Sequence, residues 1–188
     1  MDTPFDVVAL VGSLRRESFT RHLAEALIPL APPSLRFEIV PIGELSLYNQ
    51  DDEAAPPEPW QRFRQRIRRC DAVLFATAEY NRSIPACLKN AVDVGSRPYA
   101  ANVWAGKPAA VASMSPGALA GLGAHHHLRQ CLVAVGMATM AQPEACFGHV
   151  DRMVAASGEF ADGGQREYCA GFVRAFAEWI HRNPSHRP

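Results

Sequence analysis

The segment GSLRRESFT, residues 12–20, gathers hydroxyl side chains and a pair of arginines between an apolar run and an amphipathic pattern. Such a segment is expected to join a strand to a helix. The N–H groups at a helix start lack intrahelical partners, and the helix dipole favours an anion there by about 0.3 to 2 kcal/mol. Ser13, Ser18 and Thr20 add hydroxyl donors. We interpret the segment as a phosphate-monoester site; the alternative is that Ser18 only caps the helix and the arginines are solvated.

A second candidate loop, TAEYNRSIPACLKNAVD at residues 77–93, follows another apolar run. Ligands of open parallel sheets sit outside the carboxyl ends of the strands, where the strand order reverses. There Tyr80 offers an aromatic edge and Ile84 an apolar one, and the backbone N–H groups between them are suited to a heteroaromatic ring. A flat, hydrogen-bonding ring with a phosphate tail describes FMN.

Several better-known phosphate and catalytic motifs are missing from the sequence. A Walker loop needs G-x-x-x-x-G-K-[ST], but no Gly-Lys-Ser/Thr occurs, and G-x-G-x-x-G does not follow the first strand. These gaps argue against a nucleoside triphosphatase and against a standard dinucleotide-binding dehydrogenase. A G-x-S-x-G nucleophile turn and H-E-x-x-H are also lacking, which agrees with chemistry carried by a flavin instead of by side chains.

Four segments in order resemble the NAD(P)H-dependent FMN reductase family, flavodoxin-like flavoproteins that include quinone, chromate and azo-dye reductases. The segments are GSLRRESFTR, AEYNRSIPACLKNAVD, GKPAAVASMSPGALAGLGAHHHLRQCL and QPE. The resemblance implies an enzyme that uses FMN and NAD(P)H to reduce quinones, azo dyes, metal oxyanions or free flavin in a two-step, ping-pong scheme. It also implies a homodimer or homotetramer, with the third helix and the region of Lys89 and Asn90 near the contact.

Carried over by position, the resemblance assigns a role to three groups of residues. The FMN phosphate would be held by Ser13, Arg15, Ser18 and Thr20. The isoalloxazine would be lined by Glu79, Tyr80, Asn81 and Ile84, and its other edge would be closed by Ser115 and Gly117. Ala78 and Arg82 of the same loop would also bind the cofactor. Backbone N–H groups of residues 79–83 are expected to stabilise the anionic reduced flavin.

The sequence departs from the family pattern at four positions. Thr20 stands where the family usually has Asn, and it keeps a hydroxyl donor for the phosphate. Ala78 stands where Pro usually precedes Glu-Tyr-Asn, which leaves the loop less restricted in φ. Ala86 stands where Gly is common, and Ala120 where a glycine often precedes Gly121. The departures bear on how the ring is held more than on the fold.

Strands and helices that would position these loops alternate along the chain, which is typical of an α/β protein with a parallel sheet. We expect a three-layer, flavodoxin-like, doubly wound fold with strand order 2-1-3-4-5 and helices on both faces. The expected strands are 5–12, 35–42, 71–78, 107–115 and about 138–147. Helices are expected from Phe19 to the Pro32-Pro33 pair, around 60–67, at 85–94, at 122–135 and along a stripe of Tyr168, Phe172, Phe176 and Trp179.

Composition favours one globular domain covering residues 1–188. The chain is 48% hydrophobic and carries 19 basic and 19 acidic residues, so its net charge offers no general attraction to nucleic acid or membrane. Its five cysteines are odd in number and lack a C-x-x-C spacing, and no apolar stretch reaches the roughly 18 residues of a membrane span. A cytoplasmic protein is expected.

Three features suggest other functions, but each has a simpler structural explanation. The histidines at 125–127 point about 100° apart on a helix and cannot converge on one metal ion, so no metal site is predicted. The arginine-rich face of the second helix suggests RNA or a nucleotide phosphate, but a solvated face balanced by Asp51, Asp52 and Glu53 fits better. Cys87 is expected to be a packing residue.

Two rival functions remain open from the sequence. A flavodoxin-like electron carrier or FMN-binding redox sensor would hold the flavin without turning over a nicotinamide. A protein that uses the fold only as a scaffold would bind no FMN.

Overall fold

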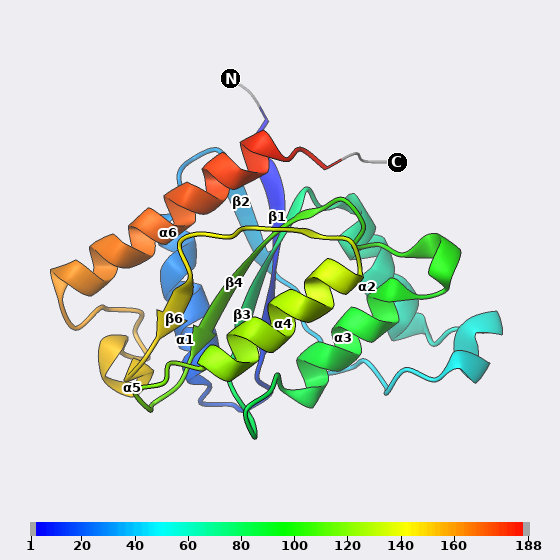
Figure 1. Cartoon of the computed structure of the whole chain (residues 1–188), viewed down its shortest axis with the longest axis horizontal. Coiled ribbons are helices and arrows are strands. Elements are labelled where there is room, and N and C mark those ends of the chain that lie inside the picture. Colours follow the sequence, from blue (N-terminus) through cyan, green and yellow to red (C-terminus); the bar gives the residue numbers. More distant parts are fainter. Residues whose placement is uncertain (1–2, 186–188) are drawn as a thin grey trace.

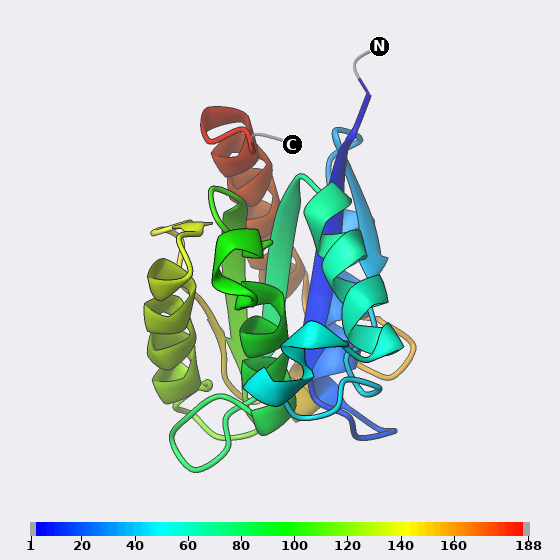
Figure 2. The same ribbon diagram turned by 90° about the vertical axis from the view of Figure 1, so that its right-hand side faces the viewer.

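The computed structural model describes residues 3–185 and shows a parallel sheet between two layers of helices (Figures 1 and 2). The sheet order is β2-β1-β3-β4-β5, with β6 also paired to β4, and every pairing is parallel. The strands are β1 (Phe5–Gly12), β2 (Leu35–Ile39), β3 (Ala72–Thr77), β4 (Pro108–Met114), β5 (Ala138–Thr139) and β6 (Ala145–Phe147). The predicted order and architecture are therefore confirmed.

Helices connect the strands and cover both faces of the sheet. They are α1 (Phe19–Leu27), α2 (Glu58–Arg69), α3 (Ala86–Ser96), α4 (Leu122–Ala134), α5 (Val150–Met153) and α6 (Gly163–Arg182). Side chains of β1 alternate between two cores, as the pleat requires. Val7, Ala9 and Val11 pack with α1 and α6, whereas Val8 and Leu10 pack with α2, α3 and α4. Because both faces of the sheet are covered, the central strands are continuous apolar runs.

The fifth strand position differs from the prediction of one strand near 138–147. Two short strands occupy it: β5 pairs with the start of β4, and β6 pairs with its end. Between them lies Pro143, whose ring nitrogen has no hydrogen to donate to a sheet ladder. The sequence therefore places the right segment beside β4 but not as an unbroken strand.

The helix predictions need smaller corrections. The first α-helix ends at Leu27 and continues as a 3-10 turn, Ile28–Leu30, before the prolines. In α6 Trp179 packs partly buried against the core as predicted, whereas Tyr168 does not belong to the buried stripe. The fully buried residues of α6 are Cys169, Ala170, Phe172, Val173, Phe176, Ala177 and Ile180. Tyr168 is 46% exposed and donates from its hydroxyl to the carbonyl of Glu144. The short helix α5 was not predicted.

Asn90 holds the long connection after β2 against the chain's own α3. Its amide oxygen accepts from the N–H of Tyr48 at 2.8 Å, and its amide nitrogen donates to the carbonyls of Leu45 (3.1 Å) and Ser46 (2.9 Å). The side chain is 7% exposed. Asn90 is therefore an internal clamp, which leaves exposed Lys89, paired with Asp93 at 2.7 Å, as the outward-facing residue of this region.

Of the predicted acidic neighbours of α2, Glu53 lies near enough to Arg64 to favour its charged form, and the ion pairs of Arg62 and Arg66 are made with other acidic residues. Arg66 pairs with Asp6 at 2.8 Å and with Glu38 at 2.7 Å, which ties α2 to β1 and β2. A separate group joins Arg62 to Glu44 and Glu58. Arg62 and Arg66, two of the five arginines of α2, are therefore paired within the described chain. No helix within residues 3–185 is long and apolar enough to cross a membrane.

Candidate functional site

The sheet register brings the three predicted loops to one edge of the molecule. Gly12 at the end of β1 pairs with Thr77 at the end of β3, and Thr77 pairs with Ser113 near the end of β4. The segments that follow these residues therefore leave adjacent strands at almost the same level, at the lower edge of the sheet in Figure 1. This edge holds every residue predicted to bind FMN.

The loop after β1 has the groups that a phosphate site needs. Ser18 is the N-cap of α1, and its Oγ accepts from the N–H of Arg21 at 3.2 Å. Within the described chain, no amide of residues 13–17 donates a hydrogen bond, so a row of N–H groups remains available beside the helix start. The Arg15 guanidinium lies 5.6 Å from the centre of the Phe19 ring, at the same helix start.

The predicted phosphate residues differ in exposure. Ser18 and Thr20 are 1% and 2% exposed, whereas Ser13 is half-buried and Arg15 exposed. A cavity of about 200 Å³ lies between this loop and residues 40–43 and is lined by Ser13, Leu14, Arg15 and Arg21, among others. The capping role of Ser18 is thus real, but a hydroxyl that accepts a hydrogen bond keeps its own proton to donate. The two interpretations of Ser18 are compatible.

The loop after β3 is a tight hairpin. Tyr80 and Ser83 exchange two backbone hydrogen bonds, both 2.9 Å, and between them Asn81 (φ 51°) and Arg82 (φ 66°) are left-handed. Two successive left-handed residues are typical of the type I′ turn. The amides of Tyr80 and Ser83 are therefore used inside the hairpin. Of the N–H groups of residues 79–83 expected to face a ring, only those of Glu79, Asn81 and Arg82 remain free in the described chain.

Side chains around the hairpin point in different directions. Tyr80 is 54% exposed at the rim, Ile84 is half-buried against the α2–α4 core, and Ala78 is half-buried where β3 ends. Glu79 turns toward α4: its Oε2 accepts from the N–H of Ala124 at 3.1 Å. The structure therefore gives the Glu79 carboxylate a partner within the protein, which the sequence pattern did not indicate.

The loop after β4 is folded back on itself. Ser115 donates from its Oγ to the carbonyl of Gly117 at 2.9 Å, and Ser113 donates to the carbonyl of Ala120 at 3.0 Å. Ala120 has a φ of 57°, in the left-handed region where glycine is favoured. The departure from a Gly-Gly pair noted in the sequence therefore falls on a backbone position that strains alanine.

Ala120→Gly should raise the free energy of unfolding by about 1 kcal/mol, because a left-handed alanine costs roughly 1 to 2 kcal/mol and the extra freedom of glycine in the unfolded chain offsets part of this. Urea denaturation measures the change. Ala118→Gly is the matched control, since Ala118 lies in the same loop without a positive φ. If both variants lost stability equally, the left-handed backbone of Ala120 would not be strained.

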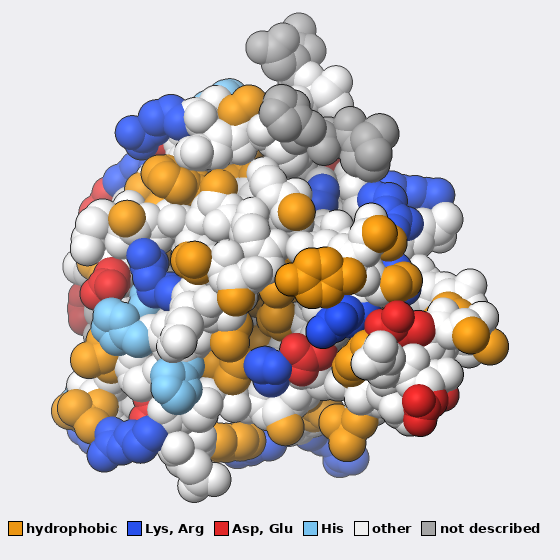
Figure 3. Space-filling model, turned by 45° about the vertical axis from the view of Figure 1, so that its right-hand side comes forward, with side chains coloured by type: hydrophobic (Ala, Val, Ile, Leu, Met, Phe, Trp, Pro, Cys, Tyr) orange, Lys and Arg blue, Asp and Glu red, His pale blue; other side chains and the backbone are white. Residues whose placement is uncertain are grey.

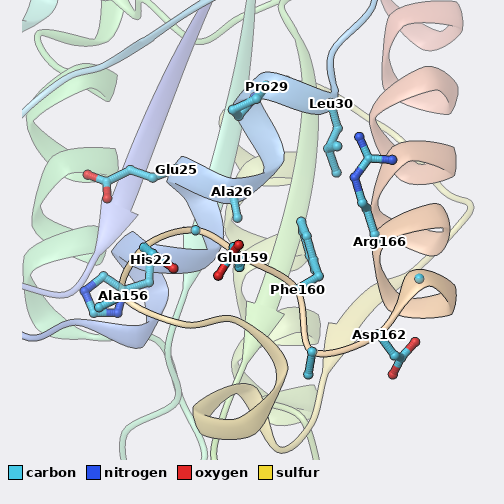
Figure 4. Close-up of a pocket in the computed structure, with 14 residues that line it drawn as sticks. His22, Glu25, Ala26, Pro29, Leu30, Ala156, Glu159, Phe160, Asp162 and Arg166 are labelled. Carbon is cyan, nitrogen blue, oxygen red and sulfur yellow. The ribbon is translucent and has the colours of Figure 1, made fainter.

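Cavity size alone does not locate this edge. A cavity of about 820 Å³, larger than the one beside the loop after β1, lies between α1 and α6, with Leu30, Phe160 and Arg166 around it (Figure 4), and none of the predicted residues lines it. A second cavity, about 780 Å³, lies between α3 and α4 and is lined by Tyr80, Asn81 and Ile84, among others. Hydrophobic and charged side chains are interspersed on the face of the molecule shown in Figure 3.

The three adjacent histidines lie in different environments. His125 is 1% exposed, His126 is exposed, and His127 places its Nδ1 2.9 Å from Ser83 Oγ. Neither ring nitrogen of His125 has a partner in the described structure, and burial lowers its pKa to about 4. Burial also raises the pKa of the Cys87 thiol, which keeps it protonated as expected of a packing residue.

Sequence reasoning missed two residues at this edge. His127 contacts the hairpin through Ser83, and Gly123 lies against it: a Cβ built on Gly123 would be 2.9 Å from the Arg82 carbonyl oxygen. The sequence gives only a weak sign of the Gly123 contact: the glycines of GLGA, residues 121–124, stand just before the histidines.

Comparison with known proteins identifies the family of this chain. Residues 5–151 match the family model described as NADPH-dependent FMN reductase. The chain belongs to that family. The predicted resemblance is thereby confirmed, and with it an oxidoreductase that uses NAD(P)H and FMN.

Full-length relatives and a solved structure agree with this assignment. A quinone reductase of Pseudomonas putida is 54% identical over 184 residues, covering 97% of this chain and 98% of that protein. A 2-hydroxy-1,4-benzoquinone reductase of Burkholderia sp is 41% identical and covers 93% and 95%. The solved flavoenzyme FerB, an NAD(P)H:(acceptor) oxidoreductase from Paracoccus denitrificans, aligns with a TM-score of 0.91 at 41% identity and covers 96% and 99%.

Proposed function

We propose that this member of the FMN reductase family is an NAD(P)H-dependent quinone reductase whose FMN lies at the edge formed by the loops after β1, β3 and β4. The observation that carries the proposal is the register of Gly12, Thr77 and Ser113, which places three chemically suited loops side by side. The quinone is inferred from the two relatives named as quinone reductases.

The loop after β1 fits the phosphate of FMN. Five consecutive amides without partners in the described chain, the start of α1 and the Arg15 charge all favour a dianion at one place. Ser13, Ser18 and Thr20 would supply hydroxyl donors. These half-buried and buried hydroxyls would fix the position of the phosphate, and the exposed Arg15 would add a charge-assisted hydrogen bond to it.

The loops after β3 and β4 would hold the isoalloxazine from two sides. The hairpin presents the free amides of Asn81 and Arg82, with Tyr80 and Ile84 as apolar contacts. Ser115 and Gly117 would close the other edge. Ring-facing amides stabilise negative charge without a side-chain acid, so no catalytic side chain is needed.

Bound FMN supplies the hydride and electron transfer. This chain's own residues hold the ring at the hairpin and keep an open edge, bordered by 54% exposed Tyr80, where a nicotinamide and then a quinone can reach it in turn. Azo dyes, metal oxyanions and free flavin are further acceptors to be tested. We also propose a cytoplasmic homodimer or homotetramer, with residues 1–188 as one FMN-binding domain.

Anaerobic mixing of the FMN-loaded protein with excess NADPH or NADH tests the function. The visible absorbance of the flavin should bleach, and addition of 1,4-benzoquinone should restore it with the quinol as product. A flavin that stays oxidised under both nucleotides would contradict the enzyme and favour an electron carrier or sensor. A protein that binds no FMN would contradict the site itself.

A further inference from the structure

The Tyr80–Ser83 hairpin needs support from outside, because its local contacts are its own backbone hydrogen bonds and an ion pair at 3.7 Å between Glu79 and the largely exposed Arg82. Its only internal backbone bonds are the two between Tyr80 and Ser83, and its tip residues, Asn81 and Arg82, are exposed and left-handed. Left-handed non-glycine residues persist where the surroundings determine them. The position of the two tip amides is therefore set by whatever the hairpin rests on.

The first turn of α4 is one support, through Glu79. The Glu79 side chain is only 12% exposed, and its Oε2 accepts from the N–H of Ala124. The N-cap of α4, Gly121, offers no side-chain cap, and the first turn of this helix contains no acidic residue. Glu79 thus supplies from another loop the acceptor and the negative charge that a helix start favours.

Gly123 is a second support, by contact. A Cβ at this position would lie 2.9 Å from the Arg82 carbonyl oxygen and 2.9 Å from Glu79 Oε2, closer than real Cβ atoms approach. The hairpin backbone therefore rests directly on the backbone of α4. The contact between Ser83 Oγ and His127 Nδ1, at 2.9 Å, adds a third attachment one turn further along the helix.

We propose that Gly123 and Glu79 are positioning residues: the first turn of α4 seats the hairpin and thereby sets where the Asn81 and Arg82 amides meet the flavin. The family resemblance implies that Glu79 lines the isoalloxazine; in this proposal Glu79 instead acts through the hairpin and does not contact the ring. This inference rests on the proposed FMN site for its functional consequence.

Four variants test the seat, that is, the support that the first turn of α4 gives to the hairpin. Gly123→Ala pushes the hairpin away without changing charge, and Glu79→Ala removes the attachment to Ala124. Glu79→Gln removes the charge but keeps an oxygen that can accept from Ala124. Gly171→Ala, in the middle of α6, is the matched glycine control, because its Cβ would have only Arg174 Nη2 within 4 Å, at 3.8 Å.

Hydrogen exchange of the apoprotein, FMN titration and the reduction potential of the bound flavin are the three readouts. Gly123→Ala and Glu79→Ala should speed exchange at residues 79–83 and weaken FMN binding about tenfold, while Glu79→Gln and Gly171→Ala stay near wild type in all three. Gly123→Ala should also lower the melting temperature relative to Gly171→Ala, because the Arg82 carbonyl oxygen has to move to make room for the new Cβ.

Three other outcomes would overturn the proposal. Unchanged exchange in Gly123→Ala and Glu79→Ala would show that α4 does not seat the hairpin. Faster exchange with unchanged FMN affinity would show that the seat does not serve the flavin. A shifted flavin reduction potential in Glu79→Gln alone would show that the carboxylate acts on the ring directly. Wild-type protein that binds no FMN would instead refute the proposed function, and with it the flavin role of the seat.

Discussion

Arg15→Ala should weaken FMN binding about tenfold to a hundredfold. A charge-assisted hydrogen bond to a phosphate contributes roughly 1.5 to 3 kcal/mol, which corresponds to that range of dissociation constants. Arg15 is exposed, and its guanidinium lies over Phe19, the first residue of α1. The charge is therefore held where the unpaired amides and the helix dipole also favour an anion. Fluorescence titration of the apoprotein with FMN measures the change.

Arg16→Ala is the matched control for this experiment. Arg16 is the next residue, is also exposed, and carries the same charge. If the field of the whole loop governed binding, both variants would weaken FMN binding equally. A larger effect of Arg15→Ala, together with a similar loss of affinity for inorganic phosphate, would locate the contact at Arg15. Unchanged FMN affinity in Arg15→Ala would place the phosphate elsewhere.

The central strands could be predicted from sequence because burial on both faces leaves a continuous apolar run. Residues 5–12 form β1 with the predicted bounds. The outermost strands beside β4 were harder to predict. The strands β5 and β6 are only two and three residues long, and a segment that contains Pro143 separates them. Short edge strands carry too few residues for a periodic pattern, so their bounds depend on pairing with β4, which the sequence does not show.

The loops of the candidate site were predictable, but the orientations within them were not. Strand order alone brings residues 13–20, 78–84 and 115–117 to one edge. Whether an amide is free, however, depends on local turns: the Tyr80 and Ser83 amides are used by the hairpin itself. Whether Glu79 faces a ligand or a helix depends on where α4 begins. The role of Gly123 follows from an approach between segments about 40 residues apart, which no local pattern encodes.

His125 should make the protein less stable as the pH falls below neutrality. This side chain on α4 is 1% exposed, and neither ring nitrogen has a partner within residues 3–185. Burial is the main cause that lowers its pKa to about 4, with Arg129 and His126 acting in the same direction and Glu144 against them. The folded protein therefore keeps a neutral imidazole in a range where an unfolded chain binds a proton.

The direction follows from which state takes up the proton first. The pKa is 6.5 for the unperturbed histidine and about 4 in the fold, so the unfolded state binds more protons between these values. Stability is fully present above pH 6.5 and is lost as the pH falls toward 4. At pH 5 the loss from this one residue is about 2 kcal/mol, since each pKa unit corresponds to about 1.4 kcal/mol.

Comparison of wild type with His125→Leu isolates this contribution, because acidic groups elsewhere titrate in both proteins. The free energy of unfolding, measured by urea denaturation at pH 7.5 and pH 5, should fall by about 2 kcal/mol more in wild type than in the variant. His126→Gln, at the exposed neighbouring position, should follow wild type. Parallel pH curves for wild type and His125→Leu would contradict a lowered pKa for His125 in the folded protein.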